Sequence, residues 1–389
     1  SRQRVTLGGS KVRTLALIVC AATVAMSTSA TAQDFVVNTG GETGAYHGQF
    51  CPALRDQIKK SGFNATCRTS AGSTENMLRV ADDPAQLGYG QLDVLALKAR
   101  EFGGASAFRR LRMDDVRECI FAVTNDKGLD SYGELAVRAD ELRFVLPPEQ
   151  SGSAATFRFL QQIDPYGIGR SEKVLHAANT DEAIRIALNS EATVAVFVQF
   201  PDPNNPRFKL AREKDGHIIP VLDRKILDQK VDGVPVYFAQ KTQVKNASWL
   251  SSGTKVVTAC TPLVVFTGTT QASANETAWE NHERMSQLLE GLRGDQLMPK
   301  AGLFSRVLRR TRELTATGAE KFVEISEQAR AKAAPLFEKA REAARQAVEA
   351  GHDKPTAVNT PVESSDPQPK EAPADQETPA NPENSVGNR

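Results

Sequence analysis

The sequence carries almost no net charge: 48 lysine and arginine residues oppose 47 aspartate and glutamate residues, which leaves +1 at pH 7. Proteins that bind nucleic acid usually carry an excess of positive charge, so we expect no nucleic-acid partner. The Gly-x-Ser-x-Gly elbow of many hydrolases and the P-loop motif are also absent. The five histidines have neither metal-binding nor catalytic spacing. We therefore predict that the protein is not an enzyme and needs no cofactor or metal. A hydrolase remains open, because the fold rather than the spacing assembles a catalytic triad.

The sequence also lacks an apolar run long enough to span a bilayer. Residues 15–26 are apolar or small; they follow the basic residues Arg2, Arg4 and Lys11 and precede Ala30-Thr31-Ala32. This order predicts a signal peptide over residues 1–32, cleaved after Ala32, and a periplasmic mature chain. A membrane anchor is one alternative. A lipoprotein signal at Cys20 is another, which the bulky residue before it disfavours.

Cysteine is scarce, with five residues, of which Cys20 lies in the predicted signal peptide. An even number of cysteines in an exported chain predicts two disulfides, for which three pairings are possible. We expect Cys51–Cys67, because these residues lie at the start of the first helix and in the next apolar segment. We expect Cys119–Cys260 because both residues lie in strand-like runs. A zinc site that uses His47 and cysteines is the alternative, but no Cys-x-x-Cys or His-x-x-x-His spacing supports it.

Between residues 34 and 293, strand-like apolar runs alternate with helical patterns. The strand-like runs fall at residues 35–38, 65–68, 87–90, 118–124, 142–146, 173–176, 193–199, 217–221 and 256–266, and helical patterns fall at 53–60, 74–81, 155–163 and 181–188. This alternation predicts an α/β fold with mostly parallel sheets.

The C-terminal part differs in composition. Residues 304–350 are rich in Ala, Glu, Arg and Lys and predict a helical extension, interrupted at Gly318 and Pro335. Residues 351–389 contain few large apolar side chains, and we expect them to form a disordered tail.

Three junctions between a strand and a helix carry small polar residues and glycine. The first runs from Thr39 to Tyr46; its glycines leave backbone N–H groups and a positive helix end free for an anion, although a tight turn without a ligand is the alternative. The second contains Ser73 and Thr74, where capping alone explains the residues. The third contains residues 151–153. In open α/β sheets ligands bind where strands end, so these junctions predict one cleft between two α/β domains.

Four segments occur in a recognisable order. They are Thr39-Gly40-Gly41 with Gly44 and Tyr46, then Gly72-Ser73-Thr74-Glu75-Asn76, then Leu87-Gly88-Tyr89-Gly90-Gln91, then Ser151-Gly152-Ser153. Over residues 34–300 this order resembles the TAXI family, the exported solute receptors of TRAP-type transporters. The resemblance implies a type II periplasmic binding fold, with two lobes and a ligand cleft. Lobe 1 would comprise residues 33–125, lobe 2 residues 126–255, and residues 256–303 would return to lobe 1 and form a closing helix.

The resemblance also implies a set of ligand-binding residues. They are Thr39, Gly40, Gly41, Thr43, Tyr46, Ser73, Thr74 and Gln91 from the first lobe, and Ser151, Gly152 and Ser153 from the second. Four features depart from the family pattern: His47 replaces an aromatic residue, Glu42 adds a carboxylate to the glycine turn, Ser153 stands where threonine is common, and the segment after Gln199 is unusually long and polar.

We therefore expect a monomeric receptor that captures a small anionic solute, an amino acid or other carboxylate, and delivers it to integral membrane transporter subunits of the TRAP type. The alternatives are a receptor for an ABC importer and an envelope interaction protein that docks a partner through its C-terminal helices.

Overall fold

The computed structural model describes residues 33–352 apart from 82, 103, 105–106, 248–251, 270–274 and 298–311. The predicted signal peptide and almost all of the predicted tail lie outside the described residues. Residues up to Phe337 form one compact unit, and those from Glu338 form a second. Both lobes described below belong to the first unit.

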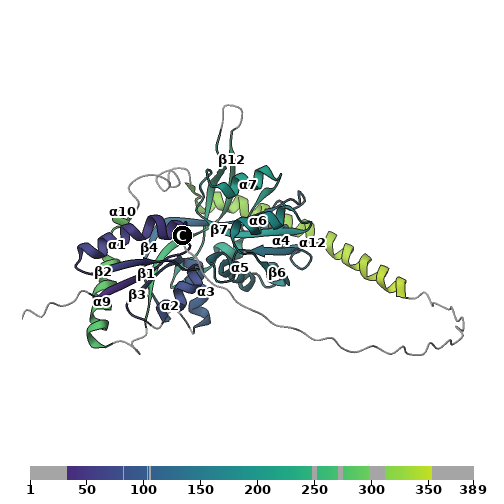
Figure 1. Ribbon diagram of the computed structural model, residues 1–389. Helices are drawn as coiled ribbons and strands as arrows, with labels where there is room; N and C mark the ends of the chain where they lie inside the picture. The colour runs from purple at the N-terminus through teal and green to yellow at the C-terminus, as the bar shows by residue number, and fades with distance from the viewer. Residues whose placement is uncertain are drawn as a thin grey trace, which may run out of the picture. The chain divides into compact units, whose positions relative to one another are not determined.

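Lobe 1 is built on three parallel strands in the order β2 (Asn64–Arg68), β1 (Asp34–Asn38) and β3 (Gln86–Gln91). Its helices are η1 (Tyr46–Phe50), α1 (Cys51–Lys60), α2 (Ser73–Ala81), α3 (Leu92–Glu101), α9 (Glu276–Gly291) and α10 (Gly294–Leu297). Figure 1 shows α1, α2, α3, α9 and α10 around these strands. Val37 of β1 and Leu54 and Ile58 of α1 are buried in one cluster, because alternate strand positions and every third or fourth helix position face the core.

Lobe 2 repeats this plan with the parallel strands β6 (Lys173–His176), β5 (Arg143–Leu146) and β7 (Thr193–Gln199). Its helices are α4 (Tyr132–Val137), α5 (Gly152–Ile163), η3 (Ile168–Arg170), α6 (Thr180–Leu188), α7 (Pro206–Glu213) and α8 (Arg224–Leu227). The short strands β8 (His217–Pro220), β9 (Lys230–Val231) and β10 (Val234–Pro235) follow.

Two long strands connect the lobes. β4 (Phe108–Thr124) pairs with β12 (Thr254–Gly268) as far as Cys119 and with β7 from Cys119 onward. β12 pairs with β3 at one end and with β11 (Phe238–Lys245) at the other. All these connecting pairs are antiparallel, whereas the core strands of each lobe are parallel. The fold is therefore α/β with two lobes, as the sequence predicts. The prediction of mostly parallel sheets is wrong, because the connecting strands make the sheet mixed.

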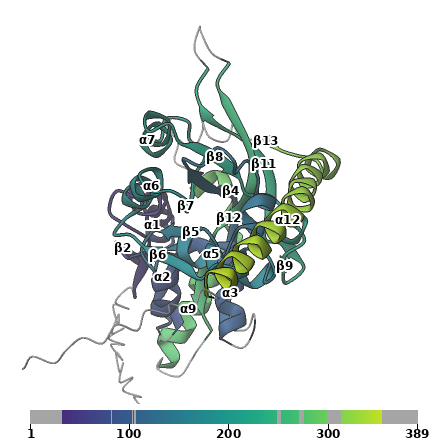
Figure 2. The ribbon, with the colours of Figure 1, turned by 90° about the vertical axis from the view of Figure 1, so that its right-hand side faces the viewer.

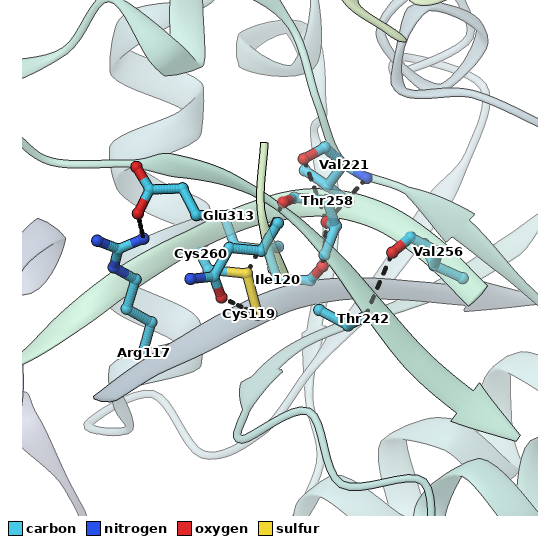
Figure 3. Close-up of a disulfide and its surroundings, with 10 residues drawn as sticks. Arg117, Cys119, Ile120, Val221, Thr242, Val256, Thr258, Cys260 and Glu313 are labelled. Atoms are coloured by element: carbon cyan, nitrogen blue, oxygen red, sulfur yellow. Dashed lines mark hydrogen bonds and ion pairs between the residues drawn. A yellow bond between two sulfur atoms is a disulfide. The ribbon is translucent and has the colours of Figure 1, made fainter. Parts of the chain in front are cut away.

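Both predicted disulfides are confirmed. Cys51–Cys67 joins α1 to β2, and Cys119–Cys260 joins β4 to β12 where β4 changes its partner. Figure 3 shows the second bond with Thr258 nearby, whose hydroxyl donates to the carbonyl oxygen of Ile120 at 2.6 Å. The connecting strands are thus held together covalently between the lobes.

The C-terminal helix α12 (Ala316–His352) follows β13 (Arg312–Glu313), which pairs with β11 (Figure 2). The helix begins only at Ala316, and Arg312 and Glu313 of the predicted helical extension form β13 instead, while the predicted interruption at Pro335 does not occur. Gly318 lies in the first turn of α12, where its N–H donates to the hydroxyl of Thr315 at 3.2 Å. Pro335 lies inside the helix, because the surrounding alanine-rich sequence favours helix enough to tolerate the loss of one backbone hydrogen bond.

The first part of α12 packs into the core of lobe 2. Val323 is 1% exposed and belongs to the same apolar cluster as the buried residues of α4 and α5. The N–H of Gly133 donates to the hydroxyl of Ser326 at 3.0 Å. A Cβ at Gly133 would lie 2.1 Å from the carbonyl oxygen of Ser326, so this close approach requires glycine.

Candidate functional site

The first glycine junction is held in place by buried hydrogen bonds. The side-chain amide of Asn76 donates to the carbonyl oxygens of Thr39 at 2.6 Å and Tyr89 at 2.8 Å. The hydroxyl of Thr39 donates to the carbonyl oxygen of Arg68 at 2.8 Å, and it therefore accepts from Nδ1 of His47 at 3.0 Å. These contacts fix the end of β1, so the glycine turn that follows starts from a rigid position.

The turn borders a pocket of about 470 Å³ between the lobes. Lobe 1 contributes the turn and the start of η1, β4 contributes Glu118, and lobe 2 contributes the end of β7 with parts of α6 and α7. The lining residues are Gly40, Thr43, Gly44, Ala45, Tyr46, Gln49, Glu118, Asp181, Val198, Gln199, Phe200, Asp202, Asn205, Pro206 and Arg207. No side chain caps η1, whose N-cap residue is Ala45, so its first N–H groups border a space that a ligand can occupy.

Glu118 is a buried acid of this pocket, with 8% of its surface exposed. The hydroxyl of Tyr46 donates to Oε2 of Glu118. Burial, together with the negative charge of Asp93, raises the pKa of Glu118 to about 7, although hydrogen bonds from Tyr46 and Gln91 and the charge of Arg207 act in the opposite direction. The carboxyl group therefore changes its charge near neutral pH.

Arg207 and Gln199 form the polar wall on the lobe 2 side. Nε of Arg207 donates to Oδ1 of Asp181 at 2.8 Å, and Nη1 donates to the amide oxygen of Gln199 at 3.1 Å. Gln199 is 4% exposed, and its Nε2 has no acceptor among the described residues. A buried amide nitrogen without a partner costs about 1–3 kcal/mol, so this group is poised to donate to a bound acceptor.

The second and third junctions meet each other rather than the pocket. A Cβ at Gly72, whose φ is +138°, would lie 3.1 Å from Cα of Ser151. A Cβ at Gly152 would lie 2.0 Å from Oε1 of Gln91 and 3.0 Å from the hydroxyl of Ser73. The starts of α2 and α5 therefore touch through glycines, and this contact joins the lobes beside the pocket.

The residues predicted from the sequence fall into three groups. Gly40, Thr43 and Tyr46 line the pocket. Ser73 forms a hydrogen bond with Tyr46, and Gln91 forms one with Glu118, so these two residues contact the lining. Thr39, Thr74, Ser151, Gly152 and Ser153 are outside the lining, and Gly41 is exposed. Ser151 caps α5 by accepting from the N–H of Ala154, and the hydroxyl of Ser153 accepts from the N–H of Val198 at 2.9 Å. Glu42 is also exposed and outside the lining.

Sequence reasoning missed the acidic residues of the pocket and one of its two aromatic residues, Phe200, whereas it predicted Tyr46. Two signals were available. Glu118 is a charged residue next to the buried strand residues Cys119 and Ile120, and the polar segment after Gln199 holds Asp202 and Asn205. A buried strand that admits a carboxylate usually does so for a partner or a ligand.

Metal binding has no support in the described ranges, where no group of three or more His, Cys, Asp or Glu side chains is placed to hold an ion. Cys51 and Cys67 are bonded to each other, so a zinc site formed with His47 would lack these sulfur ligands. Within the same described residues, every helix is too short or too polar to cross a membrane.

No protein-family model and no curated protein matches the sequence. Several solved structures are similar to the chain at low sequence identity. The periplasmic binding protein BugD is 12% identical, with a TM-score of 0.37, over 79% of this chain and 97% of that chain. MatC from Rhodopseudomonas palustris with bound malate is 12% identical, with a TM-score of 0.38, over 76% and 98%. PhnD1 from Prochlorococcus marinus in complex with methylphosphonate is 12% identical, with a TM-score of 0.41, over 76% and 98%. Likenesses this low decide neither the ligand nor the partner.

Proposed function

We propose that this protein is an exported receptor that captures a small anionic solute between its lobes and delivers it to a membrane transporter of the TRAP type. The observation that carries the proposal is the buried, unpartnered Nε2 of Gln199 in a pocket lined by both lobes. A carboxylate or phosphate oxygen of the solute would accept from this group. A pocket shared by two lobes also fits a receptor that closes around its solute.

Further groups support an anion at the lobe boundary. The uncapped start of η1 presents backbone N–H groups at the positive end of a helix. Arg207 adds a positive charge, although Asp181 neutralises part of it. Of the residues implied by the TAXI resemblance, we place Gly40, Thr43 and Tyr46 in contact with the solute. Ser73 and Gln91 would orient Tyr46 and Glu118, and the other residues would hold the junctions.

Two alternatives remain for the partner. An ABC importer would use the same pocket, and the genes beside this one would distinguish it from a TRAP transporter by the membrane subunits that they encode. An envelope interaction protein would dock a partner through the C-terminal helix. Val323 and Ser326 of that helix, however, are buried in the first unit of this chain, so the interaction protein has no stronger support than the receptor.

The proposed site is tested with Gln199→Leu. A panel of small carboxylates, amino acids and phosphonates is first screened by thermal shift, because a solute that binds only the folded state raises its stability. For the solute that binds, we expect Gln199→Leu to weaken the affinity by about 1–3 kcal/mol in titration calorimetry, since one hydrogen-bond donor is lost.

Gln243→Leu is the matched control. It removes the same amide from β11, where Nε2 donates to the carbonyl oxygen of Lys245 at 3.0 Å, outside the pocket. It should leave the affinity unchanged. If no compound of the panel stabilises the protein, the receptor function is wrong. If a solute binds the two variants equally well, the placement of the site is wrong.

A further inference from the structure

We propose that the solute carries a cationic nitrogen, such as an ammonium group, and that Glu118 and Asp202 bind it. This inference rests on the proposed function, because it describes the solute of the same pocket. It makes Glu118 a residue that determines specificity, a role that the motifs shared with solute receptors do not indicate.

The balance of charge in the pocket is the first observation. Its lining contains three carboxylates, Glu118, Asp181 and Asp202, and one cation, Arg207. The cation is already engaged, because Nε of Arg207 is 2.8 Å from Oδ1 of Asp181. Glu118 and Asp202 therefore face the cavity without a basic side chain of their own. A dicarboxylate solute would meet this uncompensated acidity, whereas an ammonium group would neutralise it.

The two acids of the proposed site are both buried. Both Glu118 and Asp202 are 8% exposed, and a buried carboxylate needs hydrogen bonds or a partner of opposite charge. Oδ1 of Asp202 accepts from the N–H of Asn204 at 3.1 Å. Glu118 has hydrogen-bonding neighbours in Tyr46 and Gln91 and a distant cation in Arg207. A cation bound between the acids would supply the missing charge.

Aromatic rings border the same space. Tyr46 and Phe200 both line the pocket, with their ring centroids 6.2 Å apart and their planes at 74°. The face of an aromatic ring attracts a cation electrostatically. Tyr46 is also the donor to Glu118, so the ring and the carboxylate approach the cavity together. The unpartnered Nε2 of Gln199, which also lines the pocket, suits a carboxylate oxygen, so the pocket matches a solute that bears both groups.

The test uses three probes with the same five-carbon chain: glutarate, 5-aminopentanoate and 1,5-diaminopentane. They share five carbons and differ in whether each end is a carboxylate or an ammonium group, and each such exchange adds one methylene group. Titration calorimetry at about pH 8 keeps Glu118 ionised, because its pKa is about 7. We expect 5-aminopentanoate to bind roughly tenfold or more tightly than glutarate, as one charge-assisted contact allows. Glu118→Gln should abolish this preference.

Glu191→Gln is the control, because Glu191 is exposed on lobe 2 and outside the pocket lining; it should keep the preference. Asp202→Asn provides a second variant, which retains the oxygen that accepts from Asn204 and should also reduce the preference. Glutarate binding as tightly as 5-aminopentanoate, or no binding of either amine, overturns the inference. A preference that survives both Glu118→Gln and Asp202→Asn does the same. The receptor function would still stand in these cases if an anion from the panel binds and Gln199→Leu weakens it.

Discussion

Asp93 is a second carboxylate buried where the lobes meet. Its Oδ2 accepts from the hydroxyl of Thr156 in α5 at 2.6 Å and from the hydroxyl of Tyr237 at 2.9 Å. Burial raises the pKa of Asp93 to about 6, although these hydrogen bonds favour the ionised form. Together with Glu118, it gives the junction between the lobes two acids that ionise within the range from weakly acidic to neutral pH.

These two acids should make the stability depend on pH. Their pKa values in the folded protein, about 7 for Glu118 and about 6 for Asp93, lie above their ordinary values. The folded state therefore keeps protons that the unfolded chain has released, and the free energy of unfolding should fall as the pH rises from about 4 to about 7. Glu118→Gln should remove its share of this loss, of the order of 1–3 kcal/mol.

Urea denaturation of the wild type and Glu118→Gln at about pH 5 and about pH 8 measures this share. The variant should become more stable relative to the wild type as the pH rises. Asp164 does not contribute to the change in stability between these two pH values. Its pKa is lowered, because hydrogen bonds from Arg330 and Lys225 outweigh the effect of its burial. Its contribution is therefore lost only below about pH 4. Parallel pH profiles for the two proteins would contradict the assignment to Glu118.

At the residue scale, the sequence predicts the glycine turn better than the rest of the pocket. Gly40 and Tyr46 are recognisable because a strand end, a glycine turn and a helix start follow one another along the chain. Glu118 and Arg207 reach the same pocket from β4 and α7. Only the pairing of β4 with β7 brings them there, and a contact over such a separation leaves no local pattern in the sequence.

At the scale of elements, α12 is joined to lobe 2 by a buried ion cluster. Arg330 donates from Nη2 to Oδ2 of Asp164 at 2.8 Å and to Oδ2 of Asp223 at 3.0 Å. Lys225 donates to the other oxygen of Asp164 at 2.6 Å. Asp164 is fully buried, so the cluster fixes α12 against α5 and α8 by more than apolar contact.

Arg330→Met should destabilise the protein strongly, because it leaves Asp164 and Asp223 with one cation fewer. Breaking a buried pair from one side costs about 3–5 kcal/mol, and we expect about 2–4 kcal/mol here because Lys225 remains. Arg224→Met is the matched control: it removes the exposed pairs with Glu320 and Glu327 on the same helix, and exposed pairs contribute little. Urea denaturation compares the two, and equal losses would show that the buried cluster is not what holds α12.

The sequence predicts the short core strands well and the connecting elements poorly. Residues 173–176 and 193–199 are predicted with the bounds that β6 and β7 have, because both are apolar runs between clear breaks. β4 begins at Phe108, ten positions before the predicted strand at 118, because its first half is rich in arginine and aspartate. The helix α3 was missed because residues 92–99 are buried on all sides, which removes the periodic polar face.

At the scale of the molecule, the lobes meet through an aromatic residue that crosses between them. Phe200 follows β7 of lobe 2, yet it is 7% exposed within the apolar cluster of lobe 1. Its ring centroid lies 5.7 Å from that of Phe50 and 6.2 Å from that of Tyr46. In addition, the disulfide between Cys119 of β4 and Cys260 of β12 holds the connecting strands together. Movement of the lobes must therefore bend these strands and withdraw Phe200 from its cluster.

Phe200→Ala should open the lobes in the absence of solute. Removing a buried phenylalanine costs about 3–5 kcal/mol, and here much of that contact exists only while the lobes touch, so the equilibrium shifts toward separation. Small-angle scattering should then give a larger radius of gyration for the variant than for the wild type, with the far-ultraviolet circular dichroism unchanged.

Tyr166→Ala is the control, because Tyr166 belongs to lobe 2 and is 87% exposed. The radius of gyration of this variant should equal that of the wild type. Adding the solute found in the panel should bring the Phe200→Ala radius back toward the wild-type value. If the radius is unchanged without solute, the glycine contacts at Gly72 and Gly152 and the buried Asp93 hold the lobes together without Phe200.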